Sequence, residues 1–540
     1  MMESQILRRI RSSFPILNTR VDGKPLIYFD NGATTQKPRE VIDAITQFYR
    51  KENANVHRAA HHLSSLATNH FEQARDKLAQ FINAKPNEIV WTRGTTEGLN
   101  LVAESFLRPI LKPGDRIVIA ISAHHAAILP FQRLAQQIGA HLDVIELTEA
   151  GELNSDQYQS YLQLKPKLVV LPHASNLLGT LYPVKEMVKQ AKRLGITTLI
   201  DGAQAAPHLV LDMQDLDADF YAFSGHKMFG PTGIGVLYGR EALLNSMPPW
   251  QVGGEMIESV SLTETRYAEA PLRFEAGTPN IAGAIGLAAA VEYLNGLDRA
   301  EIEEHEHQLA SYLLQQLKSI NGITLLPSGA ITLPIVSFYH ETINADDLAT
   351  QLDAQGIAVR AGSHCAQPLM QSFGLHSSVR ISLAFYNTLE EVERCITVLR
   401  SLCDHQTVTK DDPSDSDSAA RWIDQIEQAK DWPTRLNALM GLGSIATDPT
   451  LKRPENLVTG CASLTWLKLS IGKGSIQLDG CSESRQITAL IQLIKKQIGM
   501  GASLVQIKAY LAELGLEKQL SRTRGNAIRR LIEWLESHYS

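Results

Sequence analysis

The sequence contains no long apolar run, few cysteines and no excess of positive charge. Nowhere do about 18 apolar residues follow one another, so no membrane-spanning helix is expected. Residues 1–15 are basic and only briefly apolar, and they lack the apolar core of about 7–15 residues that defines a secretory signal. These absences favour a protein of the cytoplasm.

The cysteines form an odd, sparse set without any Cys-x-x-Cys spacing. Such a set is typical of reduced thiols in a cytosol and does not make a disulfide framework. No pair of them has the spacing of zinc ligands, so no metal site is expected. They are Cys365, Cys395, Cys403, Cys461 and Cys481.

The charge balance is slightly acidic, with a formal net charge of −7 and a pI of about 6.2. A nucleic-acid-binding protein normally presents a basic face, so this balance argues against nucleic acid as the main partner. Hydrophobic residues make up 44% of the 540 residues, which is enough for ordinary buried cores. The length predicts three or more domain-sized units.

Short apolar, β-branched runs alternate with helix-length amphipathic stretches between about residues 85 and 300. This alternation predicts an α/β domain with a largely parallel sheet, and ligands bind such sheets at the carboxyl ends of the strands. The predicted strands are Glu88–Trp91, Arg116–Ile121, Lys167–Leu171, Thr197–Ile200 and Phe220–Phe223.

From about residue 305 the pattern changes to that of a smaller α+β domain, which ends near residue 405. Its predicted helices are Glu304–Lys318, Asp346–Gln355 and Leu389–Cys403, and its predicted strands are Ile331–Tyr339, Ile357–Arg360 and Val379–Ala384.

Residues 406–420 are acidic and Ser-rich, with almost nothing to bury, and are predicted to form a linker. Residues 421–540 regain the composition of a folded core. Two strands are predicted there, at Ser463–Leu469 and Ser475–Leu478, followed by helices at Glu483–Ile498, Leu504–Leu514 and Thr523–His538.

Four short segments suggest a cofactor site. Thr95 and Thr96 follow a strand and open a helix, where free backbone N–H groups and hydroxyls can hold a phosphate. Asp201 ends a strand and can pair with a pyridinium nitrogen, and Lys227 ends the next one and can form an imine with an aldehyde. Asn176 follows a further strand. Each residue alone has an ordinary explanation as a helix cap, a turn residue or a surface amine.

Together with longer runs, these segments resemble the fold-type I, class V aminotransferase superfamily and, within it, the SUF-type cysteine desulfurases. The resemblance covers residues 1–405. It is carried by Tyr28-Phe29-Asp30-Asn31-Gly32-Ala33-Thr34-Thr35, Asn55-Val56-His57-Arg58, Gly94-Thr95-Thr96-Glu97, Ser175-Asn176-Leu177-Leu178-Gly179-Thr180, Asp201-Gly202-Ala203-Gln204, Ser224-Gly225-His226-Lys227, Arg273-Phe274-Glu275-Ala276-Gly277-Thr278-Pro279 and Arg380-Ile381-Ser382-Leu383-Ala384-Phe385.

The resemblance implies a large α/β domain at about 20–300 and a small domain made of the N-terminal segment and about 305–405. It implies pyridoxal phosphate as the cofactor, bound to Lys227 as a Schiff base. Asp201 would pair with the ring nitrogen and His124 would stack on the ring. The other implied cofactor contacts are Gln204 and Asn176 to the ring oxygen and Thr95, Thr96, Ser224 and His226 to the phosphate.

The resemblance also implies a homodimer, because Thr278 would reach the cofactor phosphate of the neighbouring subunit. Arg380 would bind the substrate carboxylate, a role that suits a planar bidentate donor, and Asn31 and His57 would also contact the substrate. By the same resemblance Cys365, in a Gly/Ser/His/Pro-flanked loop, attacks the sulfur of L-cysteine. Cys365 then carries a persulfide and alanine leaves.

Two positions depart from the family pattern. Ala123 stands where the family usually has Glu, and Ser363 stands where a His is common. Neither departure removes a group that the mechanism strictly needs. They leave open a rival reading as a carrier without catalysis. Selenocysteine lyase chemistry on the same scaffold and cleavage without a persulfide, as in kynureninase-like enzymes, are further alternatives.

Residues 421–540 resemble the SufE-like sulfur acceptors that partner these desulfurases. The matching residues are Val458-Thr459-Gly460-Cys461, Ser463, Trp466, Leu520-Ser521 and Arg524. By this resemblance Cys461 receives the persulfide sulfur, and an iron–sulfur scaffold complex takes it onward. Whether Cys461 serves its own chain or the dimer partner stays open. Cys395 and Cys403 are expected to be packing residues. Cys481 is either a bystander, which is the favoured interpretation, or a second stop for the sulfur.

Overall fold

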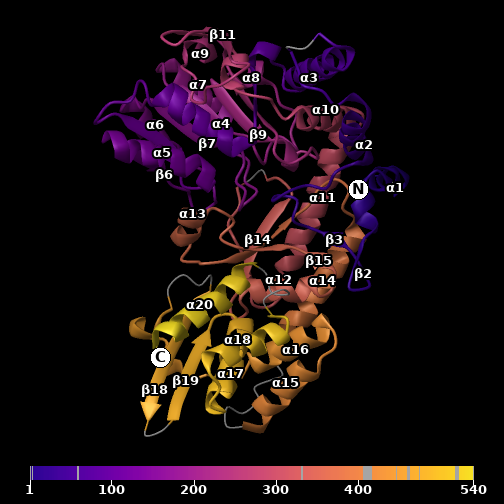
Figure 1. Cartoon of the computed structure of the whole chain (residues 1–540), viewed down its shortest axis with the longest axis vertical. Coiled ribbons are helices and arrows are strands. Elements are labelled where there is room, and N and C mark those ends of the chain that lie inside the picture. Colours follow the sequence, from indigo (N-terminus) through magenta and orange to yellow (C-terminus); the bar gives the residue numbers. More distant parts are fainter. Residues whose placement is uncertain are drawn as a thin grey trace.

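The computed structural model describes residues 2, 4–57, 60–329, 332–404, 416–445, 447–458, 463–472, 475–516 and 522–538. These residues form three bodies stacked along the long axis of the molecule (Figure 1). The large and small domains of the α/β unit lie at the top and middle, and the C-terminal domain lies below them. The predicted α/β architecture is confirmed.

A seven-stranded sheet forms the centre of the large domain. Only β10 runs antiparallel to its neighbours, β4 and β9, and the remaining pairs are parallel. The five predicted strands are present to within a residue at each end, whereas β6 and β10 were not predicted. In sheet order the strands are β4 (Ile89–Thr92), β10 (Gly235–Gly239), β9 (Phe220–Ser224), β8 (Thr197–Asp201), β7 (Leu168–Pro172), β5 (Arg116–Ala120) and β6 (His141–Ile145).

Both faces of this sheet are covered by helices, which explains the nearly continuous apolar strands. Successive side chains point to opposite faces, so Val169 and Leu171 of β7 belong to one core and Leu168 and Val170 to the other. The first core includes α3 (His62–Phe81), α7 (Val184–Arg193) and α10 (Ile281–Asn295), and the second includes α4 (Thr95–Leu101) and α5 (His125–Ile138). The further elements of this domain are α2 (Arg39–Gln47), α6 (Ser155–Gln163), α8 (Met213–Leu216), α9 (Glu241–Ser246), β11 (Ile257–Val260) and β12 (Thr265–Tyr267).

The small domain has a four-stranded antiparallel sheet in the order β13 (Ile323–Leu325), β14 (Ile335–His340), β17 (Ser378–Ser382) and β16 (Arg360–Gly362). Its helices are α11 (Arg299–Leu317), α12 (Ala345–Asp353), α13 (Gln367–Ser372) and α14 (Leu389–Asp404). α11 begins five residues before the predicted start, because the Asp298 side chain accepts hydrogen bonds from the N–H groups of Ala300 and Glu301.

The prediction of one strand over Ile357–Arg360 was wrong. The segment is divided at Val359 into β15 (Ile357–Ala358) and β16, which belong to different sheets. β15 pairs in parallel with β3 (Ile27–Tyr28), and Asp30 forms a bridge with Ser382. The strand β3 is therefore built into the small domain, whereas α1 (Ser4–Ser12) contributes Ile10 to the first core of the large domain.

The C-terminal domain has a core of its own around a β-hairpin. Its elements are α15 (Ser416–Gln428), α16 (Trp432–Leu442), β18 (Thr465–Gly472), β19 (Ser475–Ser482), α17 (Arg485–Gly499), α18 (Leu504–Glu513) and α20 (Arg522–His538). The predicted linker, 406–420, is too long at its C-terminal end, because Ser416 already begins α15; residues 405–415 lie outside the described residues. Cys461 and Leu520-Ser521 also lie outside them.

A buried carboxylate links the C-terminal domain to the small domain. Asp347 of α12 has no solvent exposure. It accepts hydrogen bonds from Ser484 Oγ at 3.1 Å and from the Arg485 backbone N–H at 2.7 Å. The carboxylate thus satisfies a free N–H group at the start of α17, where the helix dipole also favours a negative charge. Within the described ranges, no helix combines the length and apolar character needed to cross a membrane.

Candidate active site

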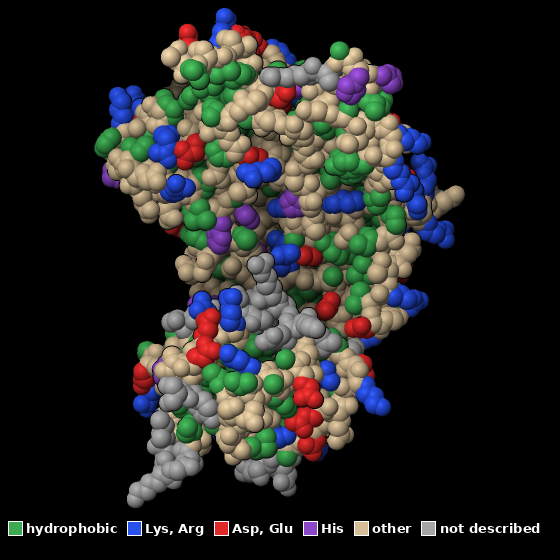
Figure 2. Space-filling model, in the orientation of Figure 1, with side chains coloured by type: hydrophobic (Ala, Val, Ile, Leu, Met, Phe, Trp, Pro, Cys, Tyr) green, Lys and Arg blue, Asp and Glu red, His purple; other side chains and the backbone are tan. Residues whose placement is uncertain are grey.

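A cavity of about 340 Å³ lies where the carboxyl ends of the large-domain strands meet the small domain. His, Lys and Arg side chains gather in the middle part of the molecule, between the large and small domains (Figure 2). The cavity brings together residues that are far apart in the chain. Of the predicted site residues, those lining it are Thr95, Thr96, His124, Asn176, Asp201, Gln204, Ser224, His226, Lys227, Cys365 and Arg380.

Asp201 and Lys227 reach the cavity from neighbouring parallel strands. Asp201 ends β8, and Lys227 follows β9 in a short turn. Burial lowers the pKa of Lys227 to about 8, although the nearby Asp201 charge opposes this effect. Burial also raises the pKa of Asp201, whose Oδ1 accepts the Ala203 N–H at 3.0 Å. The lysine is thereby prepared to react as an amine, and the second carboxylate oxygen remains available to a ligand.

Hydroxyl groups cluster at the start of α4. Ser224 Oγ accepts the Thr95 N–H at 2.8 Å and lies 2.7 Å from Thr95 Oγ1. A Cβ at Gly94 would lie 3.2 Å from Ser224 Oγ, so the glycine leaves room for this contact. Helix N–H groups and hydroxyls in this arrangement are suited to holding a phosphate, which stays a prediction for these residues.

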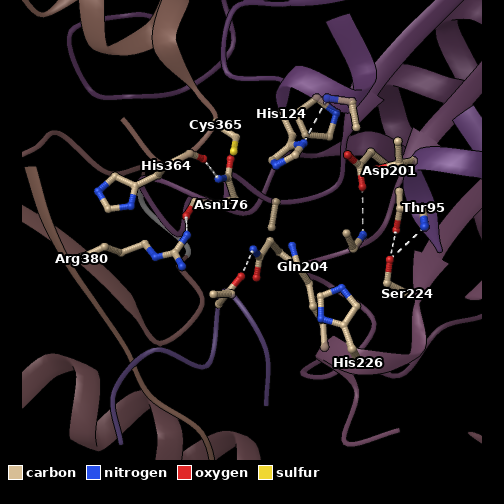
Figure 3. A pocket seen from close by; sticks show the side chains of 18 of the residues that line it. Thr95, His124, Asn176, Asp201, Gln204, Ser224, His226, His364, Cys365 and Arg380 are labelled. Atoms are coloured by element: carbon tan, nitrogen blue, oxygen red, sulfur yellow. Dashed lines mark hydrogen bonds between the residues drawn. The ribbon is translucent and has the colours of Figure 1, made fainter. Parts of the chain in front are cut away.

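His124 has a defined tautomer. As the N-cap of α5, its Nδ1 accepts the Ala126 N–H at 3.1 Å (Figure 3). Burial, followed by the charges of Lys227, His125 and Arg380, lowers the pKa of His124 to about 4. The imidazole is therefore neutral near pH 7, and its single proton is on Nε2.

Two amides join the parts of the site. Gln204 Nε2 donates to the Gly32 carbonyl at 2.8 Å and so fixes the N-terminal segment at the cavity wall. Asn176 Nδ2 donates to the His364 carbonyl at 2.6 Å and so holds the loop before Cys365 (Figure 3). Both side chains keep their amide oxygen for other contacts.

Cys365 is exposed in the cavity, as a nucleophile requires. Its neighbour His364 is buried, and His364 Nε2 donates to the Ser378 carbonyl at 3.0 Å. The His364 ring points toward Arg380 and the Cys365 sulfur lies toward His124 (Figure 3). This geometry does not favour direct activation of the Cys365 thiol by His364.

Arg380 of β17 forms the wall opposite the lysine. Its NH1 donates to the Asn176 carbonyl at 2.9 Å, and its NH2 lies 3.3 Å from Asp30 Oδ1. Its Nε is buried and has no hydrogen-bond partner among the described residues. A buried guanidinium with an unused donor is the arrangement that a carboxylate ligand would complete.

Three predicted residues do not line the cavity. The Asn31 side chain is used in hydrogen bonds with Ser382 and Tyr386. His57 Nε2 pairs with Glu72 at 2.9 Å, and Thr278 is exposed on the surface. Cys461 lies outside the described residues. Arg360 does line the cavity and was not predicted; its place at the start of the cysteine loop was the only available signal.

The residues present fit pyridoxal phosphate. The cradle of Thr95 and Ser224 suits the phosphate, the buried carboxylate of Asp201 suits a pyridine nitrogen, and the lowered pKa of Lys227 suits imine formation. All three line one cavity.

Two family models match the chain. The model "Aminotransferase class-V" matches residues 27–395, and the model "Fe-S metabolism associated domain" matches residues 420–538. A probable cysteine desulfurase of Vibrio cholerae is 47% identical over 402 residues, which is 74% of this chain and 98% of the relative.

Solved structures agree. The apo cysteine desulfurase of Thermococcus onnurineus NA1 matches with a TM-score of 0.71 and 41% identity, over 75% of this chain and all of that chain. An Escherichia coli cysteine desulfurase with an S-sulfonic acid matches with a TM-score of 0.69 and 38% identity, over 74% of this chain and 98% of the other.

Proposed function

The chain belongs to the class-V aminotransferase family and also carries a SufE domain, and we propose that it moves sulfur from L-cysteine through Cys365 to that domain. It is a cysteine desulfurase that uses pyridoxal phosphate. The exposed thiol of Cys365, in the same cavity as Lys227, Asp201 and Arg380, is the observation that carries the proposal.

When bound, pyridoxal phosphate would supply an aldehyde that forms an imine with an amine and a ring that withdraws electrons from the substrate. Lys227 anchors it, because the lowered pKa leaves a substantial fraction of neutral amine near neutral pH. Asp201 holds a proton at the pyridine nitrogen. Thr95, Thr96 and Ser224 bind the phosphate at the start of α4.

Arg380 binds the substrate carboxylate through its buried guanidinium and so turns the substrate sulfur toward Cys365. The Cys365 thiolate forms an S–S bond with that sulfur while the Cβ–S bond of cysteine breaks. The electron pair of the broken bond stays with the carbon skeleton, which gains a proton and leaves as alanine. Lys227, whose pKa is about 8, supplies that proton from its ammonium form. The neutral His124 donates a hydrogen bond from Nε2, the nitrogen that its hydrogen bond with Ala126 leaves protonated, and so orients the reacting groups.

Cys461 then takes the sulfur from the Cys365 persulfide by thiol exchange. The docked position of the C-terminal domain supports this step. Val458 N donates to the Thr465 carbonyl at 2.9 Å, and Ser482 Oγ donates to the Leu464 carbonyl at 3.0 Å. Val458 and Leu464, on either side of residues 459–462, therefore lie at the end of the hairpin where β19 finishes. Ser484, which donates to Asp347 of the small domain, follows two residues after that end.

A homodimer completes the site in this proposal. A second hollow, of about 560 Å³, opens beside the phosphate cradle and is lined by Thr95, Thr96, Ser224, His226 and Trp250 together with Arg93, Gly94, Glu97 and Asn100. The exposed Thr278 supports the expectation that the neighbouring subunit covers this opening. The match to an iron–sulfur metabolism domain supports an iron–sulfur scaffold complex as the next sulfur receiver.

The test follows sulfur on two cysteines. Cys365→Ala should abolish formation of alanine and sulfide from cysteine while leaving the cofactor absorbance intact. Cys461→Ser should slow turnover without added reductant and leave the cofactor unaffected. Cys481→Ala is the matched control, because Cys481 is buried in β19, and it should leave both rates unchanged.

Mass spectrometry after a single turnover should find one added sulfur atom, a mass increase of about 32 Da, first on the Cys365 peptide and then on the Cys461 peptide. Unchanged alanine production by Cys365→Ala would contradict the persulfide mechanism. Equal rates for Cys461→Ser and the parent would mean that the C-terminal domain only docks.

A further inference from the structure

His125 lies beside the cavity but does not line it. It is the first residue of α5, directly after His124. Its backbone N–H donates to the Cys365 carbonyl at 2.9 Å, and its Nε2 accepts the Gln367 N–H at 3.1 Å. One residue therefore holds the cysteine loop on both sides of Ala366, directly after Cys365.

The cysteine loop has an unusual backbone that needs such support. His364 and Cys365 have φ angles of 54° and 55°, so two consecutive residues with side chains are left-handed. This region is uncommon for residues other than glycine, and such residues keep it only where their surroundings determine it. Asn176 and Ser378 hold His364, and the Ala366 N–H closes the turn on the Ser363 carbonyl at 2.9 Å. His125 adds the hydrogen bonds to the Cys365 carbonyl and to the Gln367 N–H.

We propose that His125 is a positioning residue, whose imidazole holds the cysteine loop so that Cys365 faces the substrate. The proposal rests on the proposed role of Cys365 as the nucleophile. His124 and His125 are adjacent at the start of one helix, and His124 faces the cofactor pocket. The first turn of α5 therefore fixes the position of His124 in the cofactor pocket relative to the Cys365 thiol.

The chemistry of the contact explains why a neutral imidazole suits this position. The Gln367 N–H is one of the first N–H groups of α13, which have no partner within the helix. Only an unprotonated nitrogen can accept it, and burial lowers the pKa of His125. A ring without that nitrogen would leave the N–H unpaired and release one side of the loop.

The test compares His125→Phe, which keeps a ring but removes the acceptor, with His125→Gln, whose amide oxygen can replace Nε2. Both are made in the full-length holoenzyme. Three quantities are measured: kcat and KM for cysteine, the rate of Cys365 alkylation by iodoacetamide without substrate, and the cofactor absorbance. His125→Leu replaces His125→Phe if the latter fails to fold.

For His125→Phe we expect kcat to fall about tenfold with KM changed less than about twofold, because misplacing a reacting group slows the chemical step. Alkylation should become about threefold faster, since the freed loop exposes the thiol more often. His125→Gln should restore both values to within about twofold of the parent.

General damage to the fold would also lower turnover and expose the thiol, but it would change the cofactor absorbance and would not be reversed by His125→Gln. Parent-like values in His125→Phe would overturn the proposal, as would an equal loss of turnover and cofactor in both variants. If Cys365→Ala retained turnover, the proposed function itself would fail, which is a separate result from these.

Discussion

Removing the Arg380 side chain should weaken the binding of L-cysteine without affecting an analogue that lacks the carboxylate. Two donors of this guanidinium can serve a carboxylate: Nε, which has no partner among the described residues, and NH2, whose contact with Asp30 is 3.3 Å long. Asp30 keeps a partner in the variant, because Arg360 NH2 binds it at 2.8 Å. The loss is therefore confined to the substrate and to the Asn176 carbonyl.

The magnitude follows from the two donors. A hydrogen bond to a charged group contributes about 1.5–3 kcal/mol, so the pair contributes at least about 3 kcal/mol. Since about 1.4 kcal/mol changes a dissociation constant tenfold, Arg380→Ala should raise the Kd of cysteine about 100-fold. Arg380→Lys should recover only part of this loss, because an ammonium cannot bind both carboxylate oxygens in one plane.

The assay measures Kd from the change in cofactor absorbance, in a Cys365→Ala background so that no sulfur is transferred. Cysteamine, which is cysteine without the carboxylate, should bind the Arg380→Ala variant and its parent equally well. Arg360→Gln is the matched control, because Arg360 lines the same cavity but its guanidinium is used by Asp30. A loss for cysteine of less than about fivefold, or an equal loss for cysteamine, would refute the reasoning.

Three further predictions follow from the described contacts. The rate at which the apoenzyme takes up pyridoxal phosphate should rise with pH and level off above about pH 8, because the lowered pKa of Lys227 makes the reactive neutral amine predominant there. Stopped-flow absorbance measures this rate. A rise that continued toward pH 10.5 would contradict the prediction. Asp347→Ala should weaken docking of the C-terminal domain by about 1–3 kcal/mol, seen as faster hydrogen exchange of the Arg485 amide, which loses its 2.7 Å acceptor. Alkylation of the native protein should label the exposed Cys365 before the buried Cys395, Cys403 and Cys481. Burial raises the pKa of Cys395 to about 12 and that of Cys403 to about 11, so these thiols react slowly.

The parts of the site that could be predicted from the sequence are those encoded by local pattern. Asp201 and Lys227 follow strands that were predicted to within a residue, and parallel strands bring their carboxyl ends to one edge of the sheet. The cofactor, the cysteine desulfurase family and the SufE domain followed from motifs and are confirmed.

Contacts between distant segments could not be predicted in this way. Nothing local in Ile357–Arg360 indicates that the run divides to serve two sheets, since the division depends on the N-terminal strand β3. The proposed role of His125 depends on a contact between a helix start and a loop whose bonded residues are 242 positions apart in the sequence. The β10 strand was missed because its antiparallel position is set by β4 and β9, not by its own pattern.

The pairing of β3 with β15, and of Asp30 with Ser382, has a consequence for how the protein is made. Synthesis proceeds from the N-terminus, and domains generally fold as they emerge. The strands that carry Asp201 and Lys227 leave the ribosome well before β17, so the nascent large domain waits with an open pocket and an unpaired N-terminal strand. A chain that stalls before residue 380 lacks both Arg380 and Ser382, the residue that forms the β-bridge with Asp30. The C-terminal domain is translated after every residue that lines the pocket it is proposed to serve.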